Sequence, residues 1–241
     1  MDFQLIYESF PKLLAAVPAT VALASVSLFV GFLLAVPVAL ARLSHSRLLA
    51  SLGYGYVYVV RSTPLLVQMF LIYYGSGQFR IVLEHLGLWA LFRDAWFCAI
   101  LALSLNTAAY TSEIIRGGIQ SVPWGQIEAA RSIGMSSVLL FRRIVFPIAM
   151  RQALPAYGSE LMIMIKSTSL ASTITIVEVT GVAKQIISDS YRPLEVFLIA
   201  GCIYLSMNFL ISRVIFMIER RISPKRRDRG TFGSSAAAAM H

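Results

Sequence analysis

The residues from Val17 to Ala41 form an apolar run without a single charged side chain. A helix needs about 20 consecutive apolar residues to cross the hydrocarbon core of a bilayer, so this run is long enough to span a membrane. A cleaved signal peptide fits less well, because its apolar region is only about 7–15 residues long and follows a basic segment. Here the arginines, Arg42 and Arg47, come after the run.

Four further stretches are long and apolar enough to be spans, at residues 52–74, 95–115, 153–179 and 194–218. Hydrophobic residues make up 57% of the chain and charged residues 14%, against about 45–50% and about 25% in a soluble domain. We therefore predict an all-α polytopic membrane protein with about five transmembrane helices. An ordinary soluble enzyme, a disordered chain and a secreted disulfide scaffold are excluded. Cys98 and Cys202 lie in apolar runs and are interpreted as core residues rather than as a disulfide or metal pair.

The basic residues outside the spans predict the orientation of the chain, because cytoplasmic loops are enriched in lysine and arginine. One set of loops holds thirteen of them: Arg42, Arg47, Arg116, Arg131, Arg142, Arg143, Arg151, Arg220, Arg221, Lys225, Arg226, Arg227 and Arg229. The opposite set holds five: Lys12, Arg80, Arg93, Lys184 and Arg192. We therefore expect an external N-terminus and a cytoplasmic C-terminus. The net charge of +9 is explained by orientation in a lipid bilayer and not by binding of nucleic acid. Residues 1–229 form one transmembrane domain, and residues 230–241 are interpreted as a disordered tail or a non-native remnant.

The cytoplasmic loop at residues 116–152 carries the signals of structured helices rather than of a flexible connector. Ser121 is a candidate helix N-cap, Pro123 suits a first turn, and Gly134 suits a left-handed helix end. Ser136 can start a second helix, which Pro147 interrupts or ends.

Two small residues in this loop, Ala129 and Ala130, would let the backbone of another protein approach closely, with Glu128 and Arg131 fixing the orientation. Such a capped helix suits docking into a groove of a soluble partner. A helix lying on the membrane surface remains an open alternative. That alternative would be held by apolar side chains, namely Trp124, Ile127 and Ile133.

The same residues resemble the EAA loop of ABC importer permeases. The match consists of Glu128-Ala129-Ala130, Gly134 four positions later, and Ile144 before Phe146-Pro147, with Phe146 where the family has leucine. Arg61-Ser-Thr-Pro-Leu-Leu-Val-Gln68 is similar to a segment of polar amino acid permeases, with Ser62 in place of glycine. Residues 109–119 and the segment from Lys166 to Leu170 also match that subfamily. Residues 106–110 and 167–173 most resemble the M-type subunits of histidine/lysine/arginine and opine (octopine, nopaline) permeases.

This resemblance implies a type I ABC importer (MetI-like) permease fold in a bacterial inner membrane. It also implies partners: a second permease subunit, identical or a paralogue, two cytoplasmic ABC ATPase subunits, and a periplasmic binding protein that delivers an amino acid or opine. The chain itself has no Gly-x-x-x-x-Gly-Lys-Ser/Thr motif. We therefore expect no cofactor, metal or catalytic residue in this chain, and ATP with Mg to be hydrolysed by the partner subunits.

Two predicted helices each carry a polar stripe that could line a substrate pocket. Asn106 and Glu113 are seven residues apart, with Tyr110 between them, and so are Glu160 and Ser167. Seven residues are about two helical turns, so both members of a pair point in nearly the same direction. Ionisable groups in a span usually face a cavity or a partner. Carboxylates there suit an amino or guanidinium group, which favours a basic amino acid or basic opine.

Structural roles compete with substrate binding for these carboxylates. Glu113 could pair with Arg116 or a loop arginine, and Glu160 could pair with Lys166 or Arg61. Many family members have aspartate at the position of Ser167, so a family substrate carboxylate is absent here. Arg61 could contact a substrate carboxylate, or bond the carbonyls freed by Pro64, which is the interpretation we prefer.

Three other functions are possible for a polytopic membrane protein: an intramembrane enzyme, a secondary transporter and a channel. An intramembrane enzyme lacks support, because none of the three histidines lies in a span and no His-Glu-x-x-His or Gly-x-Ser-x-Gly motif occurs. An ion-gradient-driven secondary transporter is the main alternative, although no inverted repeat is recognisable. A channel would need a carbonyl filter or charged rings, which the sequence does not carry.

Overall fold

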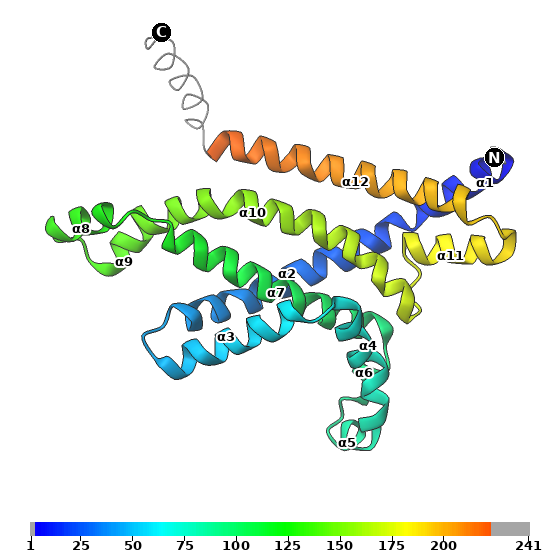
Figure 1. Cartoon of the computed structure of the whole chain (residues 1–241), viewed down its shortest axis with the longest axis horizontal. Coiled ribbons are helices and arrows are strands. Elements are labelled where there is room, and N and C mark those ends of the chain that lie inside the picture. The colour runs from blue at the N-terminus through cyan, green and yellow to red at the C-terminus, as the bar shows by residue number, and fades with distance from the viewer. Residues whose placement is uncertain (1–2, 223–241) are drawn as a thin grey trace, which may run out of the picture.

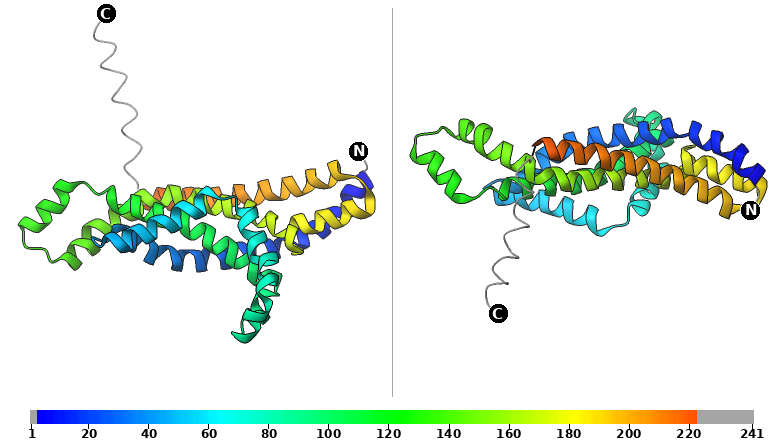
Figure 2. Two further views of the ribbon diagram at one scale, coloured as in Figure 1. Left: turned by 60° about the horizontal axis from the view of Figure 1, so that its bottom comes forward. Right: turned by 90° about the horizontal axis from the view of Figure 1, so that it is seen from above.

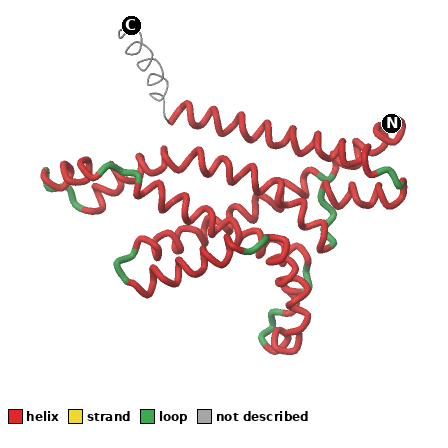
Figure 3. Tube along the Cα trace, in the orientation of Figure 1, coloured by secondary structure: helices red, strands yellow, loops and turns green. Residues whose placement is uncertain are grey.

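The computed structural model describes residues 3–222, and within that range every regular element is a helix. The predicted tail at residues 230–241 and the basic residues from Lys225 to Arg229 lie outside the described residues. The elements, joined by short loops (Figure 3), are α1 (Phe3–Ala15), α2 (Val17–Leu43), α3 (Arg47–Ser62), α4 (Leu65–Ser76), η1 (Gly77–Phe79), α5 (Arg80–His85), α6 (Trp89–Phe92), α7 (Ala95–Gln120), α8 (Trp124–Ser132), α9 (Ser137–Leu140), the π-helical turn η2 (Phe141–Val145), α10 (Phe146–Ser167), η3 (Thr168–Ile174), α11 (Val179–Ser190) and α12 (Pro193–Ile222). The predicted all-α class is confirmed.

Three stretches of helix are long and apolar enough to cross a membrane unaided: Gln4–Leu43, Ala95–Gln120 and Pro193–Ile222. Two more candidates are bent pairs, one of Arg47–Ser62 with Leu65–His85 and one of Ser137–Ile174 with Val179–Ser190. Counting each bent pair as one span gives five candidate spans. The long helices run side by side as an elongated bundle, from which α4, α5 and α6 leave at a steep angle (Figure 2).

The predicted span at residues 52–74 is not one helix but two, α3 and α4, which meet at an angle of 99°. The break lies at Thr63 and Pro64, both extended. Proline has no N–H to donate to the preceding turn and its ring clashes there, so α3 ends and α4 starts in a new direction.

The predicted span at residues 153–179 also divides. The α-helix ends at Ser167 and a 3-10 helix follows, which ends before Thr175, whose φ is +74°. Glu178 is therefore not a mid-span charge but the fully buried N-cap of α11, where its carboxylate accepts from the Gly181 N–H at 2.9 Å and from the Tyr204 hydroxyl at 2.7 Å.

The helices bring the predicted cytoplasmic loops to one end of the bundle. Figure 1 places α8 and α9 at the same end as the α2–α3 turn and the C-terminal end of α12, while α1 and α11 lie at the opposite end. Arg42 is in the last turn of α2, and Arg220 and Arg221 are in the last turn of α12. The two predicted sets of loops, one rich and one poor in basic residues, are therefore separated along the long axis.

Small residues form the tightest seam in the bundle, between α2 and α7. The buried side of α2 carries Thr20, Ala24, Ser27, Gly31, Ala35 and Ala39, spaced three or four residues apart. Small residues at this spacing let two helices approach closely within a membrane. Ser104 of α7 donates from its hydroxyl to the Ser27 carbonyl at 3.2 Å, so the seam is also hydrogen-bonded.

We expect Gly31→Val to prevent correct assembly of the protein. A Cβ at residue 31 would overlap Thr107 Cγ2 and lie 3.0 Å from the Ser104 carbonyl oxygen, and valine adds two further methyl groups. Overpacking of this kind costs about 1–3 kcal/mol or more. Thermal unfolding of detergent-purified protein measures the loss. Gly201→Ala on α12 is the control, because nothing lies within 4 Å of its added Cβ, and equal stability of both variants would contradict the seam.

The main core cluster includes Cys98, which is fully buried near the N-terminal end of α7, as predicted. Cys202 is exposed on α12 within the single chain, so its interpretation as a core residue is wrong. A free side chain in an apolar run can face the bilayer as easily as the core, and the sequence does not separate these two environments.

Candidate substrate cavity and coupling loop

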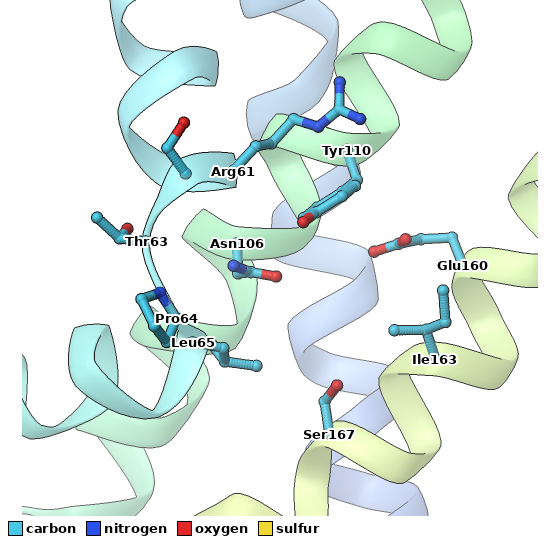
Figure 4. A pocket seen from close by; sticks show the side chains of 10 residues that line it. Arg61, Thr63, Pro64, Leu65, Asn106, Tyr110, Glu160, Ile163 and Ser167 are labelled. Carbon is cyan, nitrogen blue, oxygen red and sulfur yellow. The ribbon is translucent and has the colours of Figure 1, made fainter.

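A cavity of about 430 Å³ opens between the α3–α4 break, α7 and α10 (Figure 4). Its volume is within the range of small-molecule sites. The lining residues are Arg61, Ser62, Thr63, Pro64, Leu65, Asn106, Tyr110, Glu160, Ile163 and Ser167. The structure thus brings together four of the five predicted substrate-binding residues, Asn106, Tyr110, Glu160 and Ser167, along with two predicted as structural or gating residues, Arg61 and Pro64.

Glu160 is the acidic side chain of the cavity, and only 6% of the residue is exposed. Its carboxylate accepts a 2.7 Å hydrogen bond from the hydroxyl of Thr107 on α7. Within residues 3–222 it forms no ion pair with Lys166 or Arg61, so neither structural bridge considered for it is present. A carboxylate with one neutral donor has remaining capacity to accept hydrogen bonds from a ligand.

Arg61 supplies a positive charge on the opposite wall. Its guanidinium carbon lies 4.9 Å from the centroid of the Tyr110 ring, an arrangement typical of a cation–π contact. Figure 4 shows this guanidinium beside Tyr110 and the Glu160 carboxylate reaching toward the same space from α10. The cavity therefore presents a cation and an anion across a small gap.

The carbonyls freed at Pro64 are held by side chains other than Arg61. In a continuous helix the Val60 carbonyl would accept a hydrogen bond from the backbone N–H of residue 64, but proline has no N–H. Gln68 supplies that donor instead, from Nε2 to the Val60 carbonyl at 2.7 Å, and the Thr63 hydroxyl donates to the Val59 carbonyl at 2.9 Å. The preferred prediction that Arg61 anchors the kink is therefore wrong.

Glu113 does not reach the cavity. Its carboxylate is 2.8 Å from Arg42 Nη1 of α2 and 2.8 Å from Arg116 Nη2, one turn further along α7. The spacing of seven residues from Asn106 gave the right direction around the helix. Seven residues also correspond to about 10 Å along the helix axis, so Glu113 lies beyond the cavity, beside the arginines at the helix ends. The structural alternative considered for Glu113 is thus the one observed.

Two further residues of α10 lie outside the cavity. Met164 is buried in the main core cluster, and Lys166 is exposed on α10 and does not line the cavity. Two residues that sequence reasoning missed as site residues contribute to the site: Thr107 holds Glu160, and Gln68 holds the helix break. Both had a signal in the sequence: Thr107 is a polar neighbour of Asn106 in a spanning helix, and Gln68 ends the segment that resembles polar amino acid permeases.

The coupling loop consists of α8, α9 and the π-helical turn, and it projects beyond the end of the bundle (Figure 1). The predicted start of its first helix, with Ser121 as the N-cap, is wrong. Pro123 is the N-cap residue of α8 rather than part of its first turn, and the Ser121 hydroxyl donates back to the Gly118 carbonyl at 2.7 Å, at the end of α7. Serine can bond backbone groups on either side of a turn, which is why its direction was misjudged.

Three other predictions about this loop agree with the structure. Gly134 has φ +79°, and the Ser136 hydroxyl accepts from the Leu139 N–H at 3.4 Å as the cap of α9. Pro147 follows the five-residue π turn Phe141–Val145, after which α10 continues. A proline that cannot donate to the preceding turn interrupts regular α-helical bonding there without ending the helix.

The two alanines of the loop have different environments. Ala130 is only 2% exposed, because it packs in the loop's own apolar cluster, with Val122, Leu140 and Val145. Its predicted role as a point of close approach for a partner is therefore wrong, while Ala129 and Glu128 are exposed. Ile127 packs against the same cluster, whereas Trp124 and Ile133 are 72% and 75% exposed.

This fold and cavity define a membrane-embedded transport subunit. The chain belongs to the family of binding-protein-dependent transport system inner membrane components, whose model matches residues 27–224. It is therefore a multi-pass inner membrane permease that works in a transport complex with ATPase and binding-protein partners.

Individual relatives narrow the comparison. The chain is 68% identical to the nopaline transport system permease protein NocM of Agrobacterium fabrum over 100% of both chains. It is 42% identical to the histidine/lysine/arginine/ornithine transport system permease protein HisM of Salmonella typhimurium, over 81% of this chain and 83% of the relative. A crystal structure of an amino acid ABC transporter with histidines superposes with a TM-score of 0.81 at 34% identity, covering 92% of this chain and 99% of the other.

Proposed function

We propose that this permease imports a basic amino acid or a basic opine through the cavity between α3, α7 and α10. The observation that carries the proposal is the pair of opposite charges in the cavity wall, Glu160 and Arg61. The names of the relatives, which include nopaline and histidine/lysine/arginine/ornithine transport, point to the same chemical class.

The charges suit a substrate with a carboxylate at one end and a cation at the other. Glu160 accepts charge-assisted hydrogen bonds from an amino or guanidinium group, and Arg61 pairs with the substrate carboxylate. Asn106, Tyr110 and Ser167 add neutral polar contacts along the same walls. Among the residues that line this cavity Glu160 is the acidic one, so it carries the negative charge.

We further propose that the coupling loop docks on a cytoplasmic ATPase subunit through Glu128, Ala129 and the exposed Trp124 and Ile133. Support comes from the projection of the loop beyond the bundle and from its own apolar cluster, which keeps it rigid (Figure 1). The complete importer then contains this chain, a second permease subunit, two ATPase subunits that hydrolyse ATP with Mg, and a periplasmic binding protein. The N-terminus is external and the C-terminus cytoplasmic, in accordance with the basic loops. We propose that this chain itself needs no cofactor.

Reconstitution into proteoliposomes tests this function. We expect arginine uptake only when ATPase subunits, ATP and the binding protein are all present, and no uptake driven by a proton or sodium gradient. Vesicles that omit the binding protein are the control. Uptake by the permease alone under an ion gradient would instead establish a secondary transporter, and the proposal would be abandoned.

A further inference from the structure

Gln68, which belongs to none of the predicted site residues, connects the helix break to the cavity wall. It lies in the first turn of α4, and its Nε2 donates to the Val60 carbonyl at 2.7 Å and to the Thr63 hydroxyl at 2.7 Å. The Thr63 carbonyl is a further acceptor at 3.1 Å. All three partners offer oxygen, so the amide of Gln68 must turn its nitrogen toward α3.

This orientation decides what Asn106 presents to the cavity. With its nitrogen toward α3, Gln68 directs its Oε1 to α7, where Asn106 Nδ2 donates to it at 3.3 Å. The reversed amide of Asn106 would set two carbonyl oxygens against each other inside the protein, which is unfavourable. Asn106 therefore directs its Oδ1 toward the side of Glu160, as Figure 4 shows.

We propose that Gln68 is a positioning residue for substrate specificity. By fixing the amide of Asn106, it makes the cavity offer a second acceptor beside the Glu160 carboxylate. A guanidinium group has only donors and fits two acceptors, whereas the neutral ureido group of the same shape also carries a carbonyl oxygen, which they repel. The inference rests on the proposed function and names the residue that makes its site select a cation.

Direct binding of arginine and citrulline to the purified complete importer, without binding protein, tests this role. The two compounds differ in the guanidinium and ureido groups, and omission of the binding protein removes its own selectivity. We expect the wild type to prefer arginine. In Gln68→Leu, Asn106 is free to reverse, and the ratio of the two dissociation constants should fall about tenfold, the effect of one hydrogen bond to a charged group.

Two further variants separate positioning from a merely structural role. Gln68→Glu still accepts from Asn106 Nδ2 but cannot donate to Val60 or Thr63, so it should keep the preference for arginine while lowering thermal stability. In an Asn106→Ala background, Gln68→Leu should no longer change the ratio. If Gln68→Leu does not assemble, Gln68→Met replaces it, because methionine keeps the length of the side chain.

The outcomes distinguish the inference from the proposed function. A wild type that binds neither compound, or shows no preference, contradicts both. A wild type that prefers arginine, with an unchanged ratio in Gln68→Leu, contradicts only the role of Gln68. An equal loss of preference in Gln68→Leu and Gln68→Glu, or a loss that persists without Asn106, would show that Gln68 acts on the helix break alone.

Discussion

Replacing Glu160 with alanine is expected to abolish substrate-stimulated ATP hydrolysis by the assembled importer. Glu160 is the acidic residue of the cavity, and hydrogen bonds to a charged group contribute about 1.5–3 kcal/mol. The apparent affinity for arginine should therefore fall roughly tenfold to a hundredfold, whereas ATP hydrolysis without substrate should continue. ATPase activity of the reconstituted complex, titrated with arginine-loaded binding protein, measures both.

Glu160→Gln is the matched control for packing. Glutamine keeps the volume of the side chain and still accepts from the Thr107 hydroxyl, so the α7–α10 contact survives. It lacks the negative charge, and we expect it to lose the response to arginine almost as completely as the alanine variant. Normal transport by either variant would disprove the role of Glu160.

Gly134→Val should separate ATP hydrolysis from transport or prevent docking of the ATPase subunits. Gly134 ends α8 with φ +79°, a conformation in which a β-branched residue is strongly disfavoured. No atom lies within 4 Å of an added Cβ, so the effect comes from the backbone and not from a clash. The turn between α8 and α9 must change its shape, and we expect transport to fall at least about tenfold. Transport, ATPase activity and copurification of the ATPase are measured together.

Gly134→Asn provides the comparison at the same position. Asparagine adopts the left-handed conformation more readily than other residues with a side chain, so this variant should retain most of its transport. A fully active Gly134→Val protein would mean that the geometry of the α8–α9 turn does not transmit force.

The sequence was sufficient for the fold class and for most of the cavity. Long charge-free apolar runs identify helices in a bilayer because a helix satisfies its backbone hydrogen bonds within itself, so the helical class was predictable. The family was predictable from a different signal, the resemblance of residues 128–147 and of Arg61–Gln68 to known permease motifs. Asn106 with Tyr110, and Glu160 with Ser167, were predictable because helical spacing fixes which side chains share a face.

What the sequence could not supply was where the cavity ends along a helix and the direction of the chain after a break. Hydropathy treats residues 52–74 as one apolar stretch, although Pro64 turns the helix by 99°. The prediction that Glu113 lines the cavity was wrong for a similar reason. The face of a helix on which a residue lies does not reveal that Arg42 of another helix is its neighbour. The Gln68 bonds depend on that turn and were therefore invisible before the structure.

The seam between α2 and α7 has a consequence for the transport cycle. Gly31 leaves no space for a side chain at its contact with Thr107 of α7, and Glu113 pairs with Arg42 of α2, so we expect these two helices to move together as a single rigid plate. Asn106 and Tyr110 belong to that plate, whereas Glu160 belongs to α10. For the gap to widen, the Thr107 hydroxyl must release the Glu160 carboxylate. Under the proposed function, each passage of solute would therefore replace the Thr107 donor with one carried by the substrate, so that the carboxylate that binds the substrate would also hold the empty protein closed.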